Sequence, residues 1–175
     1  ANKIKFSKNG VNFCLNSKYG KKNIQAKAYG IFSIINIITA IAALTNNKKD
    51  FNLYSNHASK LRSVNGRMNN YRKKNYPQVF VDYAHTPDSI KKVLISIKLH
   101  FPEKEIITVF GCGGDRDKTK RKIMGKTISN YSNQIIITND NPRKEDPNLI
   151  VKDIISGISI KANYQIILNR KKAIQ

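Results

Sequence analysis

The chain has 175 residues, which suits one domain or one domain with part of another, and its 32 Lys and Arg against 11 Asp and Glu give a formal net charge of +21. That charge suggests a polyanionic partner, but Lys, Asn and Ile, whose codons are rich in A and T, dominate the composition, so we attribute much of the charge to base composition. No apolar run in the sequence reaches the length of a membrane span, and Cys14 and Cys112 lack metal-ligand spacing, which argues against a membrane protein or a disulfide framework and favours a cytoplasmic setting.

The first part of the chain is strongly basic, with 15 basic residues and one acid, Asp50, among residues 1–81. Apolar periodicity and the turn signal Asn9-Gly10 predict its elements. These are, in chain order, strands at 3–6 and 11–15 forming a hairpin, a mostly buried helix at 31–44, a loop at 46–50 and a more polar helix at 51–62. The polar segment 66–78 is predicted to be a linker between domains.

After the linker, strands and helices alternate. We expect strands at 79–81, 105–110, 134–138 and 164–168, with helices at 86–99, 120–131 and 148–158 between them. Thr86 is the expected cap of the first of these helices, and Pro87 suits its first turn. This alternation predicts an α/β fold with a parallel, doubly wound sheet whose ligand loops follow the carboxyl ends of the strands.

Two of these loops carry polar side chains suited to a nucleotide or an amino acid. Asp82 could accept hydrogen bonds from ribose hydroxyls, and the nearby His85 imidazole could contact a phosphate or a base. The alternative is that Asp82 and His85 only fix a turn and a helix cap. In the loop after 134–138, the Arg143 fork suits a carboxylate, while Asp140 and the Asn141 carbonyl suit an ammonium. The alternative there is an Asn-Pro turn with a surface arginine.

The glycine-rich loop 110–121 is less specific. Its glycines allow close approach of a ligand, but its spacing fits neither GxxxxGK[ST] nor GxGxxG, and a solvated charge run is the alternative. Cys112 between the glycines is expected to be a small buried residue and not a nucleophile, because no histidine and acid pattern accompanies it.

Taken together, three motifs resemble the C-terminal domain of the Mur ligases, and within that family the MurE-type branch. They are VDYAHTPD at 81–88, VFGCGGDRDK at 109–118 and DNPR at 140–143. Upstream, LRSVNGRM at 61–68 is similar to the family's join between domains, and 31–43 to the late helix of its central ATPase domain. The resemblance implies a Rossmann-like C-terminal domain with a mostly parallel sheet at 79–175, a linker at 66–78, and the last strands and helices of an α/β ATPase domain at 1–65.

The resemblance also implies roles for individual residues. Arg67, Asp82 and His85 correspond to ATP-binding positions, whereas Arg116, Asp140, Asn141, Pro142 and Arg143 correspond to the amino-acid pocket. The implied reaction is ATP-dependent addition of meso-diaminopimelate to UDP-MurNAc-L-Ala-D-Glu through an acyl phosphate, assisted by Mg²⁺. Diaminopimelate is favoured over lysine because its second carboxylate gives an arginine in the pocket something to pair with.

The sequence departs from the family pattern at Ser33, Asn69 and Asn169, none of which is an implied ligand. The resemblance places the phosphate loop, the main Mg²⁺ ligands and the UDP-sugar domain before residue 1, and a Gly-Lys-Gly-His-Glu element after residue 175. We therefore expect a fragment without catalytic residues of its own and inactive alone.

Three alternatives stay open. The first is a lysine-adding or other Mur-type ligase. The second is a basic nucleic-acid-binding module, although no known signature of one is present. The third is a decaying gene product, against which the intact ligand loops count. The oligomeric state is left open.

Overall fold

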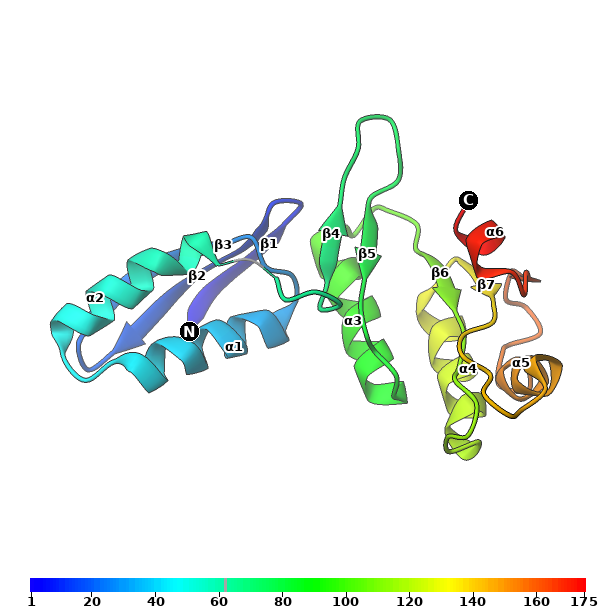
Figure 1. Ribbon diagram of the computed structural model, residues 1–175. Helices are drawn as coiled ribbons and strands as arrows, with labels where there is room; N and C mark the ends of the chain where they lie inside the picture. Colours follow the sequence, from blue (N-terminus) through cyan, green and yellow to red (C-terminus); the bar gives the residue numbers. More distant parts are fainter. Residues whose placement is uncertain (62) are drawn as a thin grey trace. The chain divides into compact units, whose positions relative to one another are not determined.

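The structure is a computed structural model that describes residues 1–61 and 63–175 and divides into two compact units (Figure 1). The first unit comprises residues 1–83 and 96–102, and the second comprises residues 84–95 and 103–175. The elements are, in chain order, β1 (Asn2–Ser7), β2 (Gly10–Ser17), β3 (Gly20–Ala26), α1 (Ile31–Leu44), α2 (Lys48–His57), the 3₁₀-helix η1 (Ala58–Lys60), β4 (Asn69–Tyr71), β5 (Val79–Val81), α3 (Pro87–His100), β6 (Ile107–Phe110), α4 (Thr119–Tyr131), β7 (Gln134–Ile137), α5 (Pro147–Ile155), β8 (Tyr164–Ile166) and α6 (Arg170–Ile174). Among the residues described, no helix is long and apolar enough to cross a membrane.

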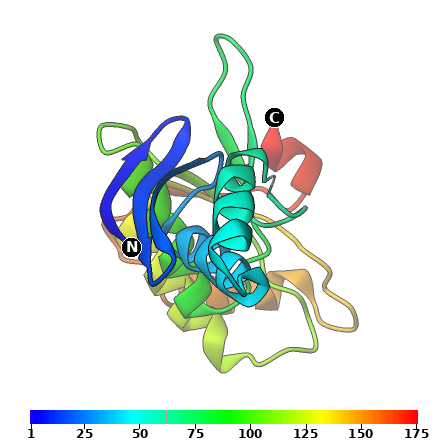
Figure 2. The ribbon, with the colours of Figure 1, turned by 90° about the vertical axis from the view of Figure 1, so that its left-hand side faces the viewer.

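The first unit is built on an antiparallel sheet in the order β1-β2-β3, covered on one face by α1 and α2. Val11, Phe13 and Leu15 alternate along β2, so they share one face of the sheet and pack into the same core as Ile34 of α1 and Phe51 of α2. Figure 2 shows both helices on the same side of the sheet. The predicted hairpin around Asn9-Gly10 is confirmed by the β1–β2 register.

The helices of this unit form where the sequence indicates, with one shifted boundary. α1 has the predicted bounds, because buried isoleucines at positions 34, 37 and 41 follow the helical period. α2 begins at Lys48, inside the predicted loop, because the Asn47 side chain caps it by accepting a hydrogen bond from the Asp50 N–H at 3.0 Å. The predicted end of this helix at residue 62 lies outside the described residues.

Two strands of the first unit were not predicted, and a third pairs differently. β3 carries few apolar residues, and β4 lies inside the polar segment 66–78 expected to be a linker. β5 was expected in the parallel sheet, but it pairs antiparallel with β4 in a separate two-stranded sheet. The connection between these two strands projects away from them (Figures 1 and 2).

The second unit contains a parallel sheet in the order β6-β7-β8, with α4 and α5 as its connections. Ile135 and Ile137 of β7 are fully buried, as are Ile128 of α4 and Ile154 of α5, so the helices and the sheet share one core. This arrangement confirms the predicted α/β class. It also places the loops that follow β6 and β7 at the same edge of the sheet.

In the first unit, His100 at the end of α3 fills both of its ring hydrogen bonds with backbone groups. Nδ1 lies 2.7 Å from the Ser7 carbonyl oxygen, and Nε2 accepts from the Gly30 N–H at 3.0 Å. The Phe6 and Tyr29 rings pack edge-on against the imidazole at 5.1 and 4.9 Å between centroids. Only the neutral Nδ1–H tautomer suits these partners, and burial lowers the pKa of His100 below its ordinary value of 6.5.

Stability should therefore fall in mild acid. Below about pH 6.5 the His100 imidazole binds a proton in the unfolded state but stays neutral in the folded state. The free energy of unfolding therefore decreases as the pH falls from about 6.5 to the lowered pKa of the folded state. His100→Gln should flatten the change in the urea midpoint between about pH 7 and pH 5. His57→Gln, at an exposed position, should retain it. An unchanged slope in His100→Gln would assign the effect to other groups.

Candidate functional site

The loops that follow β6 and β7 lie directly against each other. The Gly114 N–H donates to the Asn141 carbonyl oxygen at 2.8 Å, and the Glu145 N–H donates to the Pro142 carbonyl oxygen at 3.0 Å within the second loop. A Cβ on Gly114 would collide with the Pro142 carbonyl, and one on Gly111 would collide with the Thr138 carbonyl oxygen. These glycines are therefore required for backbone packing between two loops, which is a different use from the approach of a ligand expected from their sequence.

The predicted amino-acid pocket residues belong to these two loops. Arg116, Asp140, Asn141 and Arg143 are exposed, and Pro142 is partly buried. The Arg143 guanidinium donates to the Gly114 carbonyl oxygen, so one arginine spans both loops. The Arg143 N–H is held by the Asn141 side-chain oxygen at 3.2 Å. The structure thus brings the glycine-rich loop and the 140–143 motif together, with an exposed arginine on each.

An ionic cluster beneath these loops was missed by the sequence analysis. Arg121, in the first turn of α4, is 1% exposed and forms a two-pronged ion pair with Glu145, with N–O distances of 2.7 and 3.0 Å. Its NH1 also donates to Asp153 of α5 at 3.0 Å. The guanidinium of Arg121, with the Asp115 N–H and Lys118, lowers the pKa of Glu145 to about 2. At neutral pH the Arg121–Glu145 pair is therefore fully charged.

Two residues of these loops have left-handed backbone conformations that glycine usually adopts. They are Asp115, with φ of 51°, and Arg143, with φ of 50°. Such a conformation costs a non-glycine residue roughly 1–2 kcal/mol, so surrounding contacts must hold it. At Asp115 that contact is a 2.6 Å hydrogen bond from its N–H to the Glu145 carboxylate.

Arg67 and Asp82, two of the predicted ATP-binding residues, belong to two segments of the first unit that hydrogen bonds join. The Asp82 carboxylate accepts from the Met68 N–H at 2.9 Å, and the Tyr83 N–H donates to the Gly66 carbonyl oxygen at 2.8 Å. The Arg67 guanidinium lies over the Tyr83 ring, 5.4 Å from its centroid. His85, the third, is exposed and precedes α3 in the second unit.

Cys112 is buried at 8% exposure, as expected, and burial is the main cause that raises the pKa of its thiol to about 12. It therefore stays protonated near neutral pH and is a poor nucleophile. Within the described residues no three His, Cys, Asp or Glu side chains gather as metal ligands. The described residues therefore do not by themselves form a ligand set for Mg²⁺.

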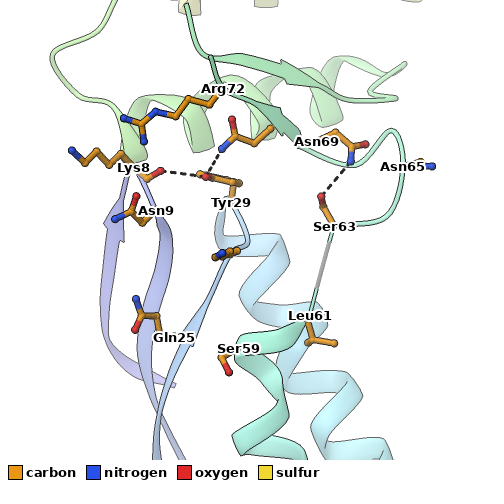
Figure 3. Close-up of a pocket in the computed structure, with 12 residues that line it drawn as sticks. Lys8, Asn9, Gln25, Tyr29, Ser59, Leu61, Ser63, Asn65, Asn69 and Arg72 are labelled. Atoms are coloured by element: carbon orange, nitrogen blue, oxygen red, sulfur yellow. Dashed lines mark hydrogen bonds between the residues drawn. The ribbon is translucent and has the colours of Figure 1, made fainter. Parts of the chain in front are cut away.

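A separate open cavity of about 780 Å³ lies in the first unit (Figure 3). It is lined mostly by polar and basic residues; the lining consists of Lys8, Asn9, Gln25, Lys27, Tyr29, Ser59, Leu61, Ser63, Asn65, Asn69, Asn70 and Arg72. On one wall the Tyr29 hydroxyl donates to the Lys8 carbonyl oxygen at 3.2 Å and accepts from the Asn70 amide. None of the predicted site residues lines this cavity, so the two loops of the second unit are the stronger candidate.

The sequence of the chain is similar to a known protein family and to curated ligases. Residues 66–175 match the family described as Mur ligase, glutamate ligase domain. A UDP-N-acetylmuramoyl-L-alanyl-D-glutamate–2,6-diaminopimelate ligase from Wigglesworthia glossinidia brevipalpis is 45% identical over 95% of this chain and 33% of its own length. The ligase of the same name from Buchnera aphidicola subsp. Baizongia pistaciae is 40% identical over 100% of this chain and 34% of its own length. The chain thus spans about a third of the length of these curated relatives.

Solved structures of ligases are similar to this chain in fold. A structure of a UDP-N-acetylmuramoyl-L-alanyl-D-glutamate–2,6-diaminopimelate ligase has a TM-score of 0.68 at 35% identity, covering 98% of this chain and 35% of that one. Mycobacterium tuberculosis folylpolyglutamate synthase complexed with ADP has a TM-score of 0.78 at 19% identity, covering 98% of this chain and 38% of that one, which supports the fold alone. The family match covers well over half of the chain and confirms the resemblance seen in its motifs. The chain therefore belongs to the Mur ligase family.

Proposed function

We propose that this chain is the part of a MurE-type ligase that receives the incoming amino acid in peptidoglycan precursor synthesis. The amino acid is meso-diaminopimelate, and its acceptor is UDP-MurNAc-L-Ala-D-Glu in the cytoplasm. The observation that carries the proposal is the junction of the two loops, where the Arg143 guanidinium reaches the Gly114 carbonyl two residues before Arg116. The names of the two curated relatives support the same substrates.

Each loop residue then has a chemical task. Arg116 and Arg143 pair with carboxylates of the bound amino acid, while Asp140 and the Asn141 carbonyl accept hydrogen bonds from an ammonium, and Pro142 shapes the turn between them. A ligand with two carboxylates can engage both arginines at once. Lysine, which has one carboxylate, cannot, so the pocket favours diaminopimelate.

Arg67, Asp82 and His85 contribute to the ATP side of the reaction in this proposal. Asp82 retains acceptor capacity for a ribose hydroxyl beyond its bond to Met68, and Arg67, the residue before Met68, presents a cation over the Tyr83 ring. The D-glutamate carboxylate of the acceptor attacks the γ-phosphate to give an acyl phosphate, and the amine of diaminopimelate then displaces phosphate. The sequence contains no GxxxxGK[ST] loop, so we propose that these 175 residues do not ligate on their own.

Arg143→Ala tests the amino-acid assignment. In an NMR titration of the chain, the variant should bind meso-diaminopimelate about tenfold more weakly or worse, since a charged hydrogen-bond partner is lost. Binding of L-lysine should change by less than about twofold, because lysine brings no second carboxylate. Lys144→Ala, which removes the neighbouring exposed cation, is the matched control. Equal losses for both ligands would favour a lysine-adding or other ligase of the family.

A further inference from the structure

Glu145 is placed where it joins the buried arginine to the exposed glycine-rich loop. One of its oxygens accepts from both the Arg121 guanidinium at 2.7 Å and the Asp115 N–H at 2.6 Å. Its second oxygen accepts from Arg121 at 3.0 Å and lies 3.3 Å from the Lys118 ammonium. With 13% of its side chain exposed, Glu145 is fixed by more contacts than a surface carboxylate usually has.

The bond to Asp115 matters because Arg116 is the next residue in the chain. Asp115 has a left-handed backbone, which aspartate adopts less readily than glycine does. The direction in which Arg116 leaves the backbone depends on the conformation of Asp115. A contact that holds the Asp115 N–H therefore fixes the backbone from which the exposed Arg116 side chain extends.

The same carboxylate also ties down the loop after β7. Glu145 belongs to that loop, and its own N–H donates to the Pro142 carbonyl oxygen at 3.0 Å, one residue before Arg143. Arg121 in turn lies 3.4 Å from the Gly113 carbonyl oxygen, which it approaches with the NH2 group that also meets Glu145. One ion pair thus connects the backbone beside Arg116 with the backbone beside Arg143.

We propose that Glu145, held in place by Arg121, is a positioning residue that sets the separation of Arg116 and Arg143 and so selects an amino acid with two carboxylates over one with a single carboxylate. This inference rests on the proposed function. Glu145 itself need not touch the ligand. Its effect passes through the Asp115 backbone and the turn at Pro142.

Asp153 provides a matched control. It lies in α5 and contacts the same Arg121 at 3.0 Å. Within the ionic cluster, Asp153 makes no hydrogen bond to the described residues of either loop. Asp153→Asn and Glu145→Gln each remove one negative charge from Arg121 and keep the side-chain shape. If Glu145 has a purely structural role, both variants should change the selectivity between the two ligands only in proportion to their loss of stability. A positioning role predicts that only Glu145→Gln changes selectivity.

The test is an NMR titration of the 175-residue chain and both variants with meso-diaminopimelate and with L-lysine, together with amide hydrogen exchange and melting temperature. Glu145→Gln should weaken diaminopimelate binding about fivefold to tenfold, leave lysine within about twofold, and speed Asp115 amide exchange about tenfold. Asp153→Asn should leave the affinity ratio and the Asp115 exchange unchanged. The positioning role would be overturned if the ratio of diaminopimelate affinity to lysine affinity were the same in both variants, or if that ratio simply followed the melting temperature.

The exchange measurement separates this inference from the proposed function. Faster Asp115 exchange in Glu145→Gln with no preference of the unmutated chain for diaminopimelate would contradict the proposed substrate and the selectivity inferred from it. A clear preference for diaminopimelate that survives Glu145→Gln would support the proposed function and refute the role of Glu145.

Discussion

Gly114→Ala should disrupt the junction between the loops that follow β6 and β7. A methyl group at this position would overlap the Pro142 carbonyl, which belongs to the backbone and cannot rotate away. Relief requires the loops to separate, at a cost of about 1–3 kcal/mol, the usual range for forcing extra atoms into a packed site. Separation also breaks the hydrogen bond from the Gly114 N–H to Asn141. We expect a lower melting temperature and, in the NMR titration, a loss of diaminopimelate binding.

Gly113→Ala is the control one residue away. An added Cβ there would meet its nearest atom, the Asn141 carbonyl oxygen, at 3.5 Å, which is an ordinary van der Waals contact. The variant should change stability by less than about 0.5 kcal/mol. If both alanine variants lowered the melting temperature equally, the packing of Gly114 against Pro142 would not be the cause.

Arg121→Met should cause the largest loss of stability among the charged residues of the second unit. Methionine keeps most of the side-chain volume but leaves Glu145 without its main partner. Removing one member of a buried ion pair costs about 3–5 kcal/mol, and we expect the low end because Asp153 is 42% exposed and remains hydrated. About 3 kcal/mol corresponds to a melting temperature roughly 6–12 °C lower for a chain of this size, measurable by thermal unfolding followed by circular dichroism.

Lys120→Met is the matched control from the same turn of α4. Lys120 pairs with Asp117 at 3.3 Å, but both side chains are about half exposed. Exposed pairs of this kind contribute between zero and about 1 kcal/mol, so the melting temperature should hardly change. Equal shifts for the two variants would show that general loss of positive charge, and not the buried pair, governs stability.

The fold could be predicted where hydrophobic periodicity is strong. α1 was predicted with its observed bounds because isoleucines recur at helical spacing, and β7 because three isoleucines stand together. β3 and β4 escaped prediction because their sequences, GKKNIQA and NNY, are too polar to show a strand pattern. The pairing of β5 with β4 depends on contacts between segments, which local periodicity does not encode.

The two loops that follow β6 and β7 could be placed from the sequence, because polar residues directly follow apolar strands. The ionic cluster could not. Arg121 and Glu145 are 24 residues apart, and in a chain this rich in lysine and arginine a buried cation has no local signature. A signal was available in the helical spacing that places Arg121 on the same face of α4 as Met124 and Ile128, since a charge on a buried face demands a partner. The assignments of Arg67, Asp82, His85, Arg116 and the 140–143 motif to ligands remain predictions.

The burial of both cysteines makes the chain convenient for site-specific labelling. Cys14 is 1% exposed and Cys112 is 8% exposed, and the Cys112 thiol stays protonated near neutral pH. Thiol reagents act on exposed thiolates, so neither native cysteine competes with a cysteine introduced on the surface. A single cysteine replacing the exposed Lys144, in the loop that follows β7, would carry a fluorophore without prior removal of the native thiols. Movements of that loop during ligand binding thereby become observable in real time in the otherwise unmodified sequence.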